Sequence, residues 1–373
     1  MVLMEEFYEI LNDPYAYGRK CKAEKGSTII GYFCSYTPEE IICAAGAHPM
    51  RLFGTRGDIS LADAHLQTYS CSLVRGALEE ALRGRLDFLN GTVFPHTCDS
   101  IQRLSDIWRL NTEFGFFADV VLPVKLDTES ARRYMEDVLH KFKRDLEKGL
   151  GRTITDSDMN VAIEKYNEIR ECLGTIYQLR SEEPGIISGS NMYTIIKGSM
   201  IMDRDDLLEK LPALVEHIQR GEMASDTADR KRIVLVGSIC DHPDVYRVLE
   251  ASDAVVVWDD LCTGSRYFEG TIATAGDPVA AVARRYIERS ICPAKHLSMT
   301  ARGDKIVEIV RSHSADGVVF LLLKFCDPHA FDYPYMKEYL DKAGIPTMLL
   351  EVEDQLPAEG QLHTRFETFV QML

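Results

Sequence analysis

Three cysteines stand where a predicted strand ends or a predicted helix begins: Cys71, Cys98 and Cys326. Each lies beside a turn-forming or helix-capping residue, such as Asp99 after Cys98 and Asp327 after Cys326. An ordinary buried cysteine lies inside an apolar run and packs as a small hydrophobe, whereas loops of this kind carry the chemistry of α/β proteins. Helix N-termini and free backbone N–H groups favour thiolates there. Three thiolates on one metal centre leave a position open for substrate, which points to an iron–sulfur enzyme.

The composition is typical of a globular chain with a substantial core. The 373 residues are 46% hydrophobic and 27% charged, and this length is sufficient for two domains of ordinary size. The formal net charge is −16, and no long basic block offsets it, which argues against a nucleic-acid or anionic-membrane partner. An anionic ligand would therefore be held by local arginines and helix N-termini.

The sequence also indicates the compartment. Residues 1–7 lack the basic and apolar regions of a signal peptide, and no apolar run approaches the roughly 18 residues of a membrane span. We therefore expect a cytoplasmic protein whose ten cysteines are thiols or metal ligands rather than disulfides. The absence of a CxxC pair disfavours thioredoxin-like redox chemistry and closely spaced zinc knuckles.

The elements that must position these cysteines follow from the hydrophobic pattern. Short apolar runs alternate with helical patterns in the first and last thirds, which predicts βαβ repetition and parallel sheets. Strands are expected at residues 28–33, 50–53, 86–94, 114–122, 232–238, 254–260, 317–324 and 346–352. Between about residues 130 and 220 the apolar side chains recur every three or four positions, which indicates helices.

We therefore expect an α/β fold of two doubly wound, mostly parallel-sheet domains with a helical insert between them. The expected N-terminal α/β domain spans residues 1–128, the helical insert or cap 129–228 and the C-terminal α/β domain 229–373. The chain contains no GxxxxGK[ST] loop, so it should not hydrolyse ATP itself. It also lacks the GxGxxG fingerprint, HExxH and GxSxG, which disfavours nucleotide-dependent dehydrogenases, zinc proteases and serine hydrolases.

Several separated segments resemble the family of 2-hydroxyacyl-CoA dehydratase components, which also includes benzoyl-CoA reductase subunits and double-cubane cluster proteins. The resemblance covers nearly the whole chain, and it is the combination of segments that makes it specific. The segments are GYFCSYTPEE at 31–40, AAG at 44–46, PMR at 49–51, CS at 71–72, CD at 98–99, DD at 259–260, GSR at 264–266, FCD at 325–327, GIP at 344–346 and EGQLHTRFE at 359–367.

This resemblance implies a 4Fe–4S cluster held by Cys71, Cys98 and Cys326, with the fourth iron free for water or the thioester carbonyl of an acyl-CoA. It also implies a separate ATP-dependent iron–sulfur activator that delivers one low-potential electron. One-electron reduction of the acyl-CoA thioester would give a ketyl radical that eliminates water, and in the benzoyl-CoA reductase branch the electron would enter an aromatic ring. One cluster can bind all three cysteines only if the strand-end loops of both domains face a common cleft.

Two alternatives stay open within the same family. Double-cubane relatives use six cysteines, so some of the loop cysteines Cys34, Cys240, Cys262 and Cys292 could complete a larger cluster. The chain could instead be an electron-relay subunit without an acyl-CoA site of its own. Family members associate in pairs, so we expect either a homodimer or a heterodimer with a homologous subunit.

Two further residues are candidates for catalysis. Ser35 lies in the loop before Pro38, where family members contact substrate near the cluster, although such a serine is more often an N-cap or turn hydroxyl. His96 is close enough in sequence to Cys98 to donate a proton or to support the cluster, although a lone histidine is more often an ordinary loop residue.

Charged residues near the predicted strand ends allow two interpretations each. Glu39 and Glu40 could contact a ligand or could simply favour the dipole of their helix. Asp259, Asp260 and Arg266 occupy a strand-end loop, the usual place of a ligand crevice in such sheets, but a structural salt bridge between them is equally compatible with the sequence.

Overall fold

The structure is a computed structural model that describes residues 2–55, 57–225, 230–289, 292–298, 300–353 and 355–373. Its contacts divide the chain into two compact units. Unit 1 comprises Met1–Arg170, Gly198–Leu208 and Gly270–Leu297, and unit 2 comprises Glu171–Lys197, Glu209–Glu269 and Ser298–Leu373. Both units are discontinuous in sequence. The sequence predicts three consecutive domains with boundaries at residues 128 and 228, and this division stays a prediction.

Each unit is built on a four-stranded, all-parallel sheet. The sheet of unit 1 has the order β2-β1-β3-β4, with β1 (Ile29–Tyr32), β2 (His48–Arg51), β3 (Gly91–Pro95) and β4 (Phe116–Val120). The sheet of unit 2 has the order β6-β5-β7-β8, with β5 (Lys231–Gly237), β6 (Ala254–Asp260), β7 (Gly317–Leu323) and β8 (Thr347–Val352). The predicted α/β fold with two parallel-sheet domains is confirmed.

The central strands are apolar and buried on both faces, as parallel strands are when helices cover the two sides of a sheet. All residues of β1, β2 and β3 are buried, and so are the last five residues of β5. The continuous apolar runs that predicted these strands are therefore the cores of the two sheets.

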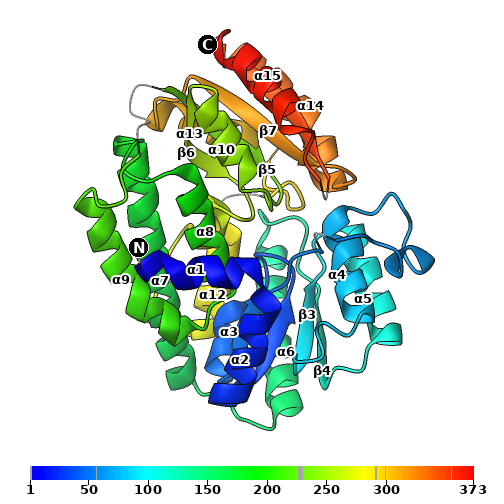
Figure 1. The fold of residues 1–373 in the computed structure, drawn as a ribbon. Helices are drawn as coiled ribbons and strands as arrows, with labels where there is room; N and C mark the ends of the chain where they lie inside the picture. The colour runs from blue at the N-terminus through cyan, green and yellow to red at the C-terminus, as the bar shows by residue number, and fades with distance from the viewer. Residues whose placement is uncertain (1, 56, 226–229, 290–291, 299, 354) are drawn as a thin grey trace. The chain divides into compact units, whose positions relative to one another are not determined.

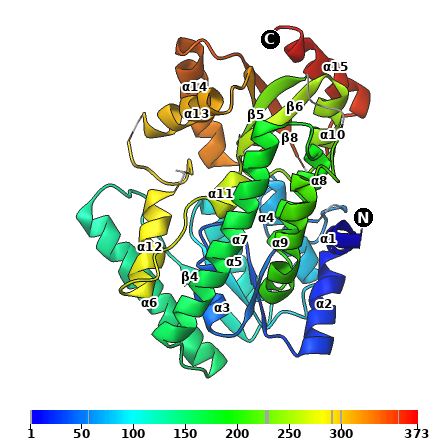
Figure 2. The same ribbon diagram turned by 90° about the vertical axis from the view of Figure 1, so that its left-hand side faces the viewer.

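The helices of unit 1 cover both faces of its sheet. They are α1 (Val2–Asn12), α2 (Pro14–Lys25), α3 (Glu39–Ala44), the 3₁₀ turn η1 (Ala62–Ala64), α4 (Ser72–Leu82), α5 (Asp99–Asn111), α6 (Glu129–Leu150) and α12 (Pro278–Glu288). Figure 1 shows α4 and α5 side by side next to β3. Figure 2 shows α6 and α12 packed together, although they are far apart in the sequence. Their contact joins one hydrophobic core that includes Met135, Phe142 and Tyr286.

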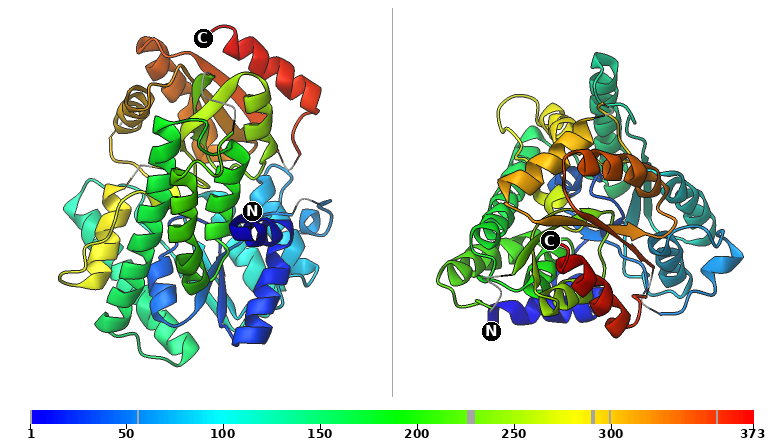
Figure 3. Two further views of the ribbon diagram at one scale, coloured as in Figure 1. Left: turned by 60° about the vertical axis from the view of Figure 1, so that its left-hand side comes forward. Right: turned by 90° about the horizontal axis from the view of Figure 1, so that it is seen from above.

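The helices of unit 2 also lie on both faces of their sheet. They are α10 (Asp244–Ala251), α11 (Ser265–Phe268), α13 (Ala301–Ser312), α14 (Asp327–Lys342) and α15 (Glu359–Val370). Figure 3 shows α13 and α14 on one face and α10 and α15 on the other. The helices α7 (Asp156–Glu182), α8 (Gly189–Ser199) and α9 (Arg204–Gln219) contribute residues to both units. None of the helices among the described residues is long and apolar enough to cross a membrane.

In each sheet the first strand in sequence lies in the interior and has neighbours on either side. In unit 1, β1 pairs with β2 and β3, and in unit 2, β5 pairs with β6 and β7. The chain segments that link these neighbouring strands therefore run to opposite sides of β1 and of β5. In parallel sheets, ligands commonly bind at such a switch point, beyond the carboxyl ends of the strands. Cys34 and Cys98 follow β1 and β3, and Cys240 and Cys326 follow β5 and β7.

Three details differ from the sequence expectation. The sequence pattern predicts a helix over residues 333–342, but α14 begins at Asp327, because Pro328 occupies its first turn and Pro334 is tolerated inside it. Residues 86–89 form a turn rather than part of a strand. Helix α12, which was not predicted, packs against α6 in the core of unit 1.

The close approach of β5 and β7 gives a first prediction. A Cβ added at Gly237 would overlap the backbone carbonyl of Leu321, so Gly237→Ala should lower the stability of the protein by about 1–3 kcal/mol. Gly174 in α7 has open space around its Cα, so Gly174→Ala should raise stability by about 0.5–1 kcal/mol. Urea unfolding of both variants measures the difference, and a Gly237→Ala variant as stable as wild type would contradict the register of this sheet.

Candidate functional site

Each of the three cysteines singled out in the sequence is the N-cap residue of a helix. Cys71 precedes α4, Cys98 precedes α5 and Cys326 precedes α14. None of the three side chains caps its helix by a hydrogen bond. The first-turn N–H groups and the positive end of the helix dipole therefore stay close to each sulfur, an environment that favours negative charge.

The topology explains why these N-termini lie at the functional edge of each sheet. Helix α4 connects β2 to β3, α5 connects β3 to β4, and α14 connects β7 to β8. Because the strands are parallel, a crossover helix begins just beyond the carboxyl end of the preceding strand. Cys71 and Cys98 therefore lie at the same edge of the sheet of unit 1, and Cys326 lies at the corresponding edge of the sheet of unit 2.

Four cysteines gather in unit 1. Burial, with a smaller contribution from the neighbouring thiols of Cys71, Cys34 and Cys292, raises the pKa of Cys98 to about 12. Cys34 accepts a hydrogen bond from the hydroxyl of Thr97, with 3.6 Å between oxygen and sulfur. Without a metal, Cys98 is therefore a neutral thiol, and a bound cation would have to displace its proton.

Cys34 and Cys292 were only two of several loop cysteines in the sequence, and the structure brings both close to Cys98. The position of Cys34 directly after β1 could have indicated this, because β1 and β3 are neighbours. No local signal could have placed Cys292, which follows α12 and comes from a distant part of the chain. Cys292 comes close to Cys98 because α12 packs against α6.

Cys326 lies in a tight connection of unit 2. Its N–H donates to the carbonyl of Leu323 at 2.9 Å, and its own carbonyl accepts the N–H of Ala330 at 2.9 Å. Phe325 just before it has a φ of 63°, a left-handed conformation that is uncommon for a bulky residue. Such conformations concentrate at functional sites. The connection between β7 and α14 thus holds the thiol in one defined position.

The other two loop cysteines also belong to unit 2. The N–H of Cys240 donates to the hydroxyl of Thr263 at 2.9 Å, and Arg266 donates to the sulfur of Cys262 at 3.5 Å. Within the described parts of the chain, no group of three His, Cys, Asp or Glu side chains could hold a metal ion by itself. Cys326 is described with unit 2, so the three-cysteine ligand set stays a prediction.

His96, two residues before Cys98 in the sequence, contacts Asp119. Its Nε2 lies 2.8 Å from Oδ1 of Asp119, and the same carboxylate oxygen accepts a hydrogen bond from Ser105. The side chain of His96 is 17% exposed, so it can still reach a ligand. The carboxylate of Asp119 fixes the orientation of the imidazole, an arrangement common to histidines that transfer protons. Nothing in the local sequence around His96 indicated this partner.

Ser35 is buried in the turn between β1 and α3. The N-cap residue of α3 is Pro38, and no side chain caps this helix, so Ser35 is not its capping hydroxyl. The turn is closed by a hydrogen bond from the N–H of Thr37 to the carbonyl of Cys34 at 2.9 Å. Ser35 therefore stands between Cys34 and α3 at the carboxyl edge of the sheet, and its role toward a substrate stays a prediction.

The two glutamates of α3 form buried ion pairs. Glu39 accepts from Arg204 at 2.9 Å and from the hydroxyl of Tyr166 at 3.1 Å, and Glu40 pairs with Arg170. Burial opposes the ionisation of Glu40, but the charge of Arg170 keeps its pKa below the ordinary value. The helices α7 and α9 thus supply the partners of the conspicuous PEE motif, which is structural.

The strand-end residues of β6 are also paired. Asp260 lies 2.7 Å from Arg302 and 3.6 Å from Arg266, and Asp259 accepts from the hydroxyl of Tyr177 at 2.5 Å. Burial raises the pKa of Asp259 to about 6, although this hydrogen bond opposes the shift. The structure therefore contains the salt bridge between Asp260 and Arg266 that the sequence allows.

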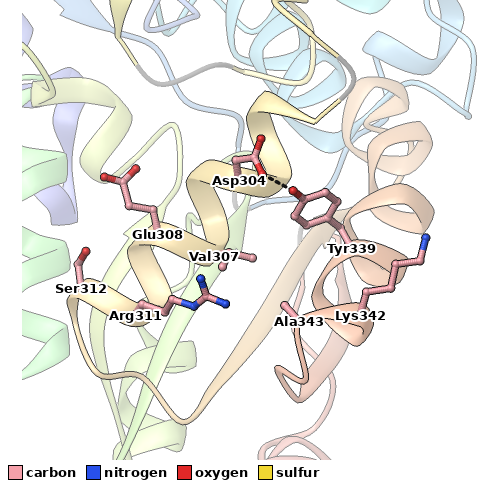
Figure 4. A pocket seen from close by; sticks show the side chains of 8 residues that line it. All are labelled: Asp304, Val307, Glu308, Arg311, Ser312, Tyr339, Lys342 and Ala343. Carbon is pink, nitrogen blue, oxygen red and sulfur yellow. Dashed lines mark hydrogen bonds between the residues drawn. The ribbon is translucent and has the colours of Figure 1, made fainter.

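A surface groove between α13 and α14 of unit 2 has a volume of about 580 Å³. Figure 4 shows Asp304 and Tyr339 turned toward each other across it, joined by a hydrogen bond, with Arg311 and Lys342 further along. None of the cysteines or other predicted site residues lines this groove. Its lining combines the acidic side chains of Asp304 and Glu308 with the basic side chains of Arg311 and Lys342.

Comparison with known proteins finds a matching family model and several similar chains. The family model described as 2-hydroxyglutaryl-CoA dehydratase, D-component, matches residues 34–373. The (R)-phenyllactyl-CoA dehydratase beta subunit of Clostridium sporogenes is 31% identical over 368 residues, which cover 99% of this chain and 98% of the relative. A benzoyl-CoA reductase subunit of Thauera aromatica is 28% identical over 349 residues, with coverage of 92% and 89%. The (R)-2-hydroxyglutaryl-CoA dehydratase, subunit beta, of Acidaminococcus fermentans is 26% identical over 380 residues, with coverage of 100% and 99%.

Proposed function

The chain belongs to the 2-hydroxyglutaryl-CoA dehydratase D-component family, and we propose that it is the iron–sulfur subunit of a 2-hydroxyacyl-CoA dehydratase-type enzyme. Its substrate would be an acyl-CoA thioester carrying a hydroxyl group. The observation that carries this proposal is the position of Cys71 and Cys98 at two helix N-termini on one sheet edge, with Cys326 at the equivalent position of the second sheet.

The side chains at these positions fit a 4Fe–4S cluster. Sulfur donors select iron–sulfur clusters over hard cations such as Mg²⁺ or Ca²⁺, and the side chains that raise the pKa of Cys98 are the thiols of Cys71, Cys34 and Cys292. Cys71, Cys98 and Cys326 would hold the cluster. When bound, the cluster would supply single electrons at low potential and an open iron site that acts as a Lewis acid.

The protein would have further tasks besides binding the cluster. The buried positions of Cys71 and Ser35 support exclusion of water from the reacting groups. His96, held by Asp119, would give or take a proton at Nε2 or Nδ1 when the hydroxyl group leaves. Ser35 would position the substrate by a hydrogen bond. The first-turn N–H groups of α4 and α5 would stabilise negative charge on the thiolates.

The relatives suggest how the protein is used. Two of those compared are named as beta subunits of dehydratases, which supports assembly of this chain with a homologous partner. The family resemblance implies an ATP-dependent iron–sulfur activator, which would deliver the electron, and the sequence of this chain has no phosphate-binding loop of its own. The cytoplasm is the compartment in which such an electron chain would operate.

A benzoyl-CoA reductase-type subunit is the second candidate, because the Thauera aromatica relative aligns over 92% of the chain. An electron-relay subunit without an acyl-CoA site would use the same three cysteines, and a double-cubane reductase would add some of Cys34, Cys240, Cys262 and Cys292. The isolated chain separates these possibilities, since an acyl-CoA site would let added thioester change the cluster spectrum. A relay subunit would give no such change.

Anaerobic purification with iron counting and acyl-CoA titration tests the proposal. We expect a brown protein with about four irons per chain, and 2-hydroxyacyl-CoA thioesters should perturb its cluster spectrum more than benzoyl-CoA does. About eight irons per chain would indicate the double-cubane alternative. A chain that holds no iron after purification or reconstitution would overturn the proposed function.

His96 gives a further prediction about turnover. His96→Ala should lower dehydration about 10²–10⁴-fold, because it removes the positioned proton donor, while the iron content should stay at the wild-type level. Asp119→Asn keeps the shape of the pair and should cause a smaller loss. The measurements are activity with the complete enzyme system and iron analysis of the same samples. Unchanged turnover in His96→Ala would remove this residue from the mechanism.

A further inference from the structure

Lys295 is a buried lysine in the segment that follows α12. It is only 2% exposed, and its Nζ donates a hydrogen bond to the carbonyl of Leu122 at 3.3 Å. Among the described residues, no carboxylate lies within ion-pair distance of this ammonium group. A buried ammonium group without a counter-ion is rare, because removing it from water costs several kcal/mol.

The groups around Lys295 are aromatic rings, a second cation and two thiols. Its Nζ lies 5.7 Å from the ring centre of Tyr36, and the guanidinium of Arg289 stacks on the same ring at 4.1 Å. The backbone N–H of Lys295 donates to the carbonyl of Cys292 at 2.8 Å, which fixes the short turn between the two residues. Cys34 and Cys292 both pack against the hydrophobic core that contains Tyr36.

The positive charge of Lys295 has no carboxylate partner among the described residues. Burial lowers the pKa of Lys295 to about 8, and only Cys34 and Cys292 act in the opposite direction. The same two thiols lie near Cys98. The buried ammonium group of Lys295 thus lies near Cys34 and Cys292, which in turn lie near Cys98. An anion bound at these cysteines would supply the negative charge that Lys295 lacks.

We propose that Lys295, assisted by Arg289, is a buried counter-charge for the anionic iron–sulfur centre of the proposed function. This inference rests on the proposed function and adds to it a positioning residue outside the ligand set. The ammonium group favours the reduced, more negative form of the centre and so raises its reduction potential.

The first test compares reduction potentials of iron-loaded proteins by redox titration followed by electron paramagnetic resonance. In Lys295→Met the ratio of reduced to oxidised centre at a fixed potential should fall about tenfold, which for a one-electron couple equals about 59 mV. Lys295→Arg keeps the charge and should restore most of the ratio. Lys141→Met, which changes an exposed lysine of α6 in the same unit, should leave the ratio unchanged.

The second test uses thermal unfolding with and without the centre. In the cluster-free protein, Lys295→Met removes a buried charge that has no counter-ion, so its midpoint should equal or exceed that of wild type. In the iron-loaded protein the same substitution should lower the midpoint, because the counter-charge is then in use. This change of sign is expected only if the partner of Lys295 arrives with the centre.

The outcomes separate the proposal from the function on which it rests. Iron-loaded Lys295→Met with a wild-type potential overturns the role of Lys295 and leaves the proposed function intact. Equal destabilisation of the cluster-free and iron-loaded forms also overturns it, since the lysine would then serve only to bind the carbonyl of Leu122. Failure of wild type and all variants to retain iron overturns the proposed function, and the inference falls with it.

Discussion

Replacing Cys98 with alanine is expected to remove most of the iron from the protein and to lower dehydration more than about 100-fold. Loss of a group that merely supports a metal ligand costs 10–100-fold in affinity or activity, and loss of the ligand itself should cost more. Cys71→Ala and Cys326→Ala should have the same effect. Iron analysis and visible spectra of anaerobically purified variants give the measurement.

Cys172→Ala is the matched control for these three substitutions. Cys172 is a half-buried cysteine within α7, remote in sequence from any strand end, so this variant should keep its iron and its spectrum. Full iron content in Cys71→Ala, Cys98→Ala or Cys326→Ala would exclude that residue from the ligand set. Because Cys34 and Cys292 lie near Cys98, they are the next residues to replace in that case.

Replacing Arg204 with methionine is expected to lower the free energy of unfolding by about 3–5 kcal/mol. The guanidinium group is buried and donates to Glu39 at 2.9 Å, to the hydroxyl of Tyr166 at 2.7 Å and to the carbonyl of Pro49 at 3.0 Å. It therefore connects α3, α7 and the start of β2. Its removal leaves the carboxylate of Glu39 buried without its cation, which costs more than the hydrogen bonds themselves.

Urea unfolding checks this prediction against two reference variants. Arg204→Lys keeps the charge but cannot reproduce the forked geometry, so it should still lose a large part of the stability. Arg109→Met changes an arginine that is 57% exposed and should shift the free energy of unfolding by less than about 0.5 kcal/mol. A loss below about 1 kcal/mol in Arg204→Met would mean that the network around Glu39 contributes little.

The sequence by itself determined the fold class and the family. Continuous apolar runs such as Gly317–Leu323 predict buried parallel strands because both faces of such strands are covered. The three cysteines were located correctly at helix starts because proline, aspartate and serine beside them are local signals for a change of element. These signals depend only on near neighbours in the chain, so they can be read without the structure.

Only the tertiary structure decided which side chains surround the cysteines. Cys292 and Lys295 reach unit 1 through the packing of α12 against α6, and His96 gains Asp119 from the neighbouring strand β4. Glu39 was expected at a helix start, but its cation Arg204 comes from α9. Burial and charge pairing join residues that are distant in sequence, and hydrophobic periodicity carries no information about such pairs. The electrostatic surroundings of the site are therefore a property of the folded chain alone.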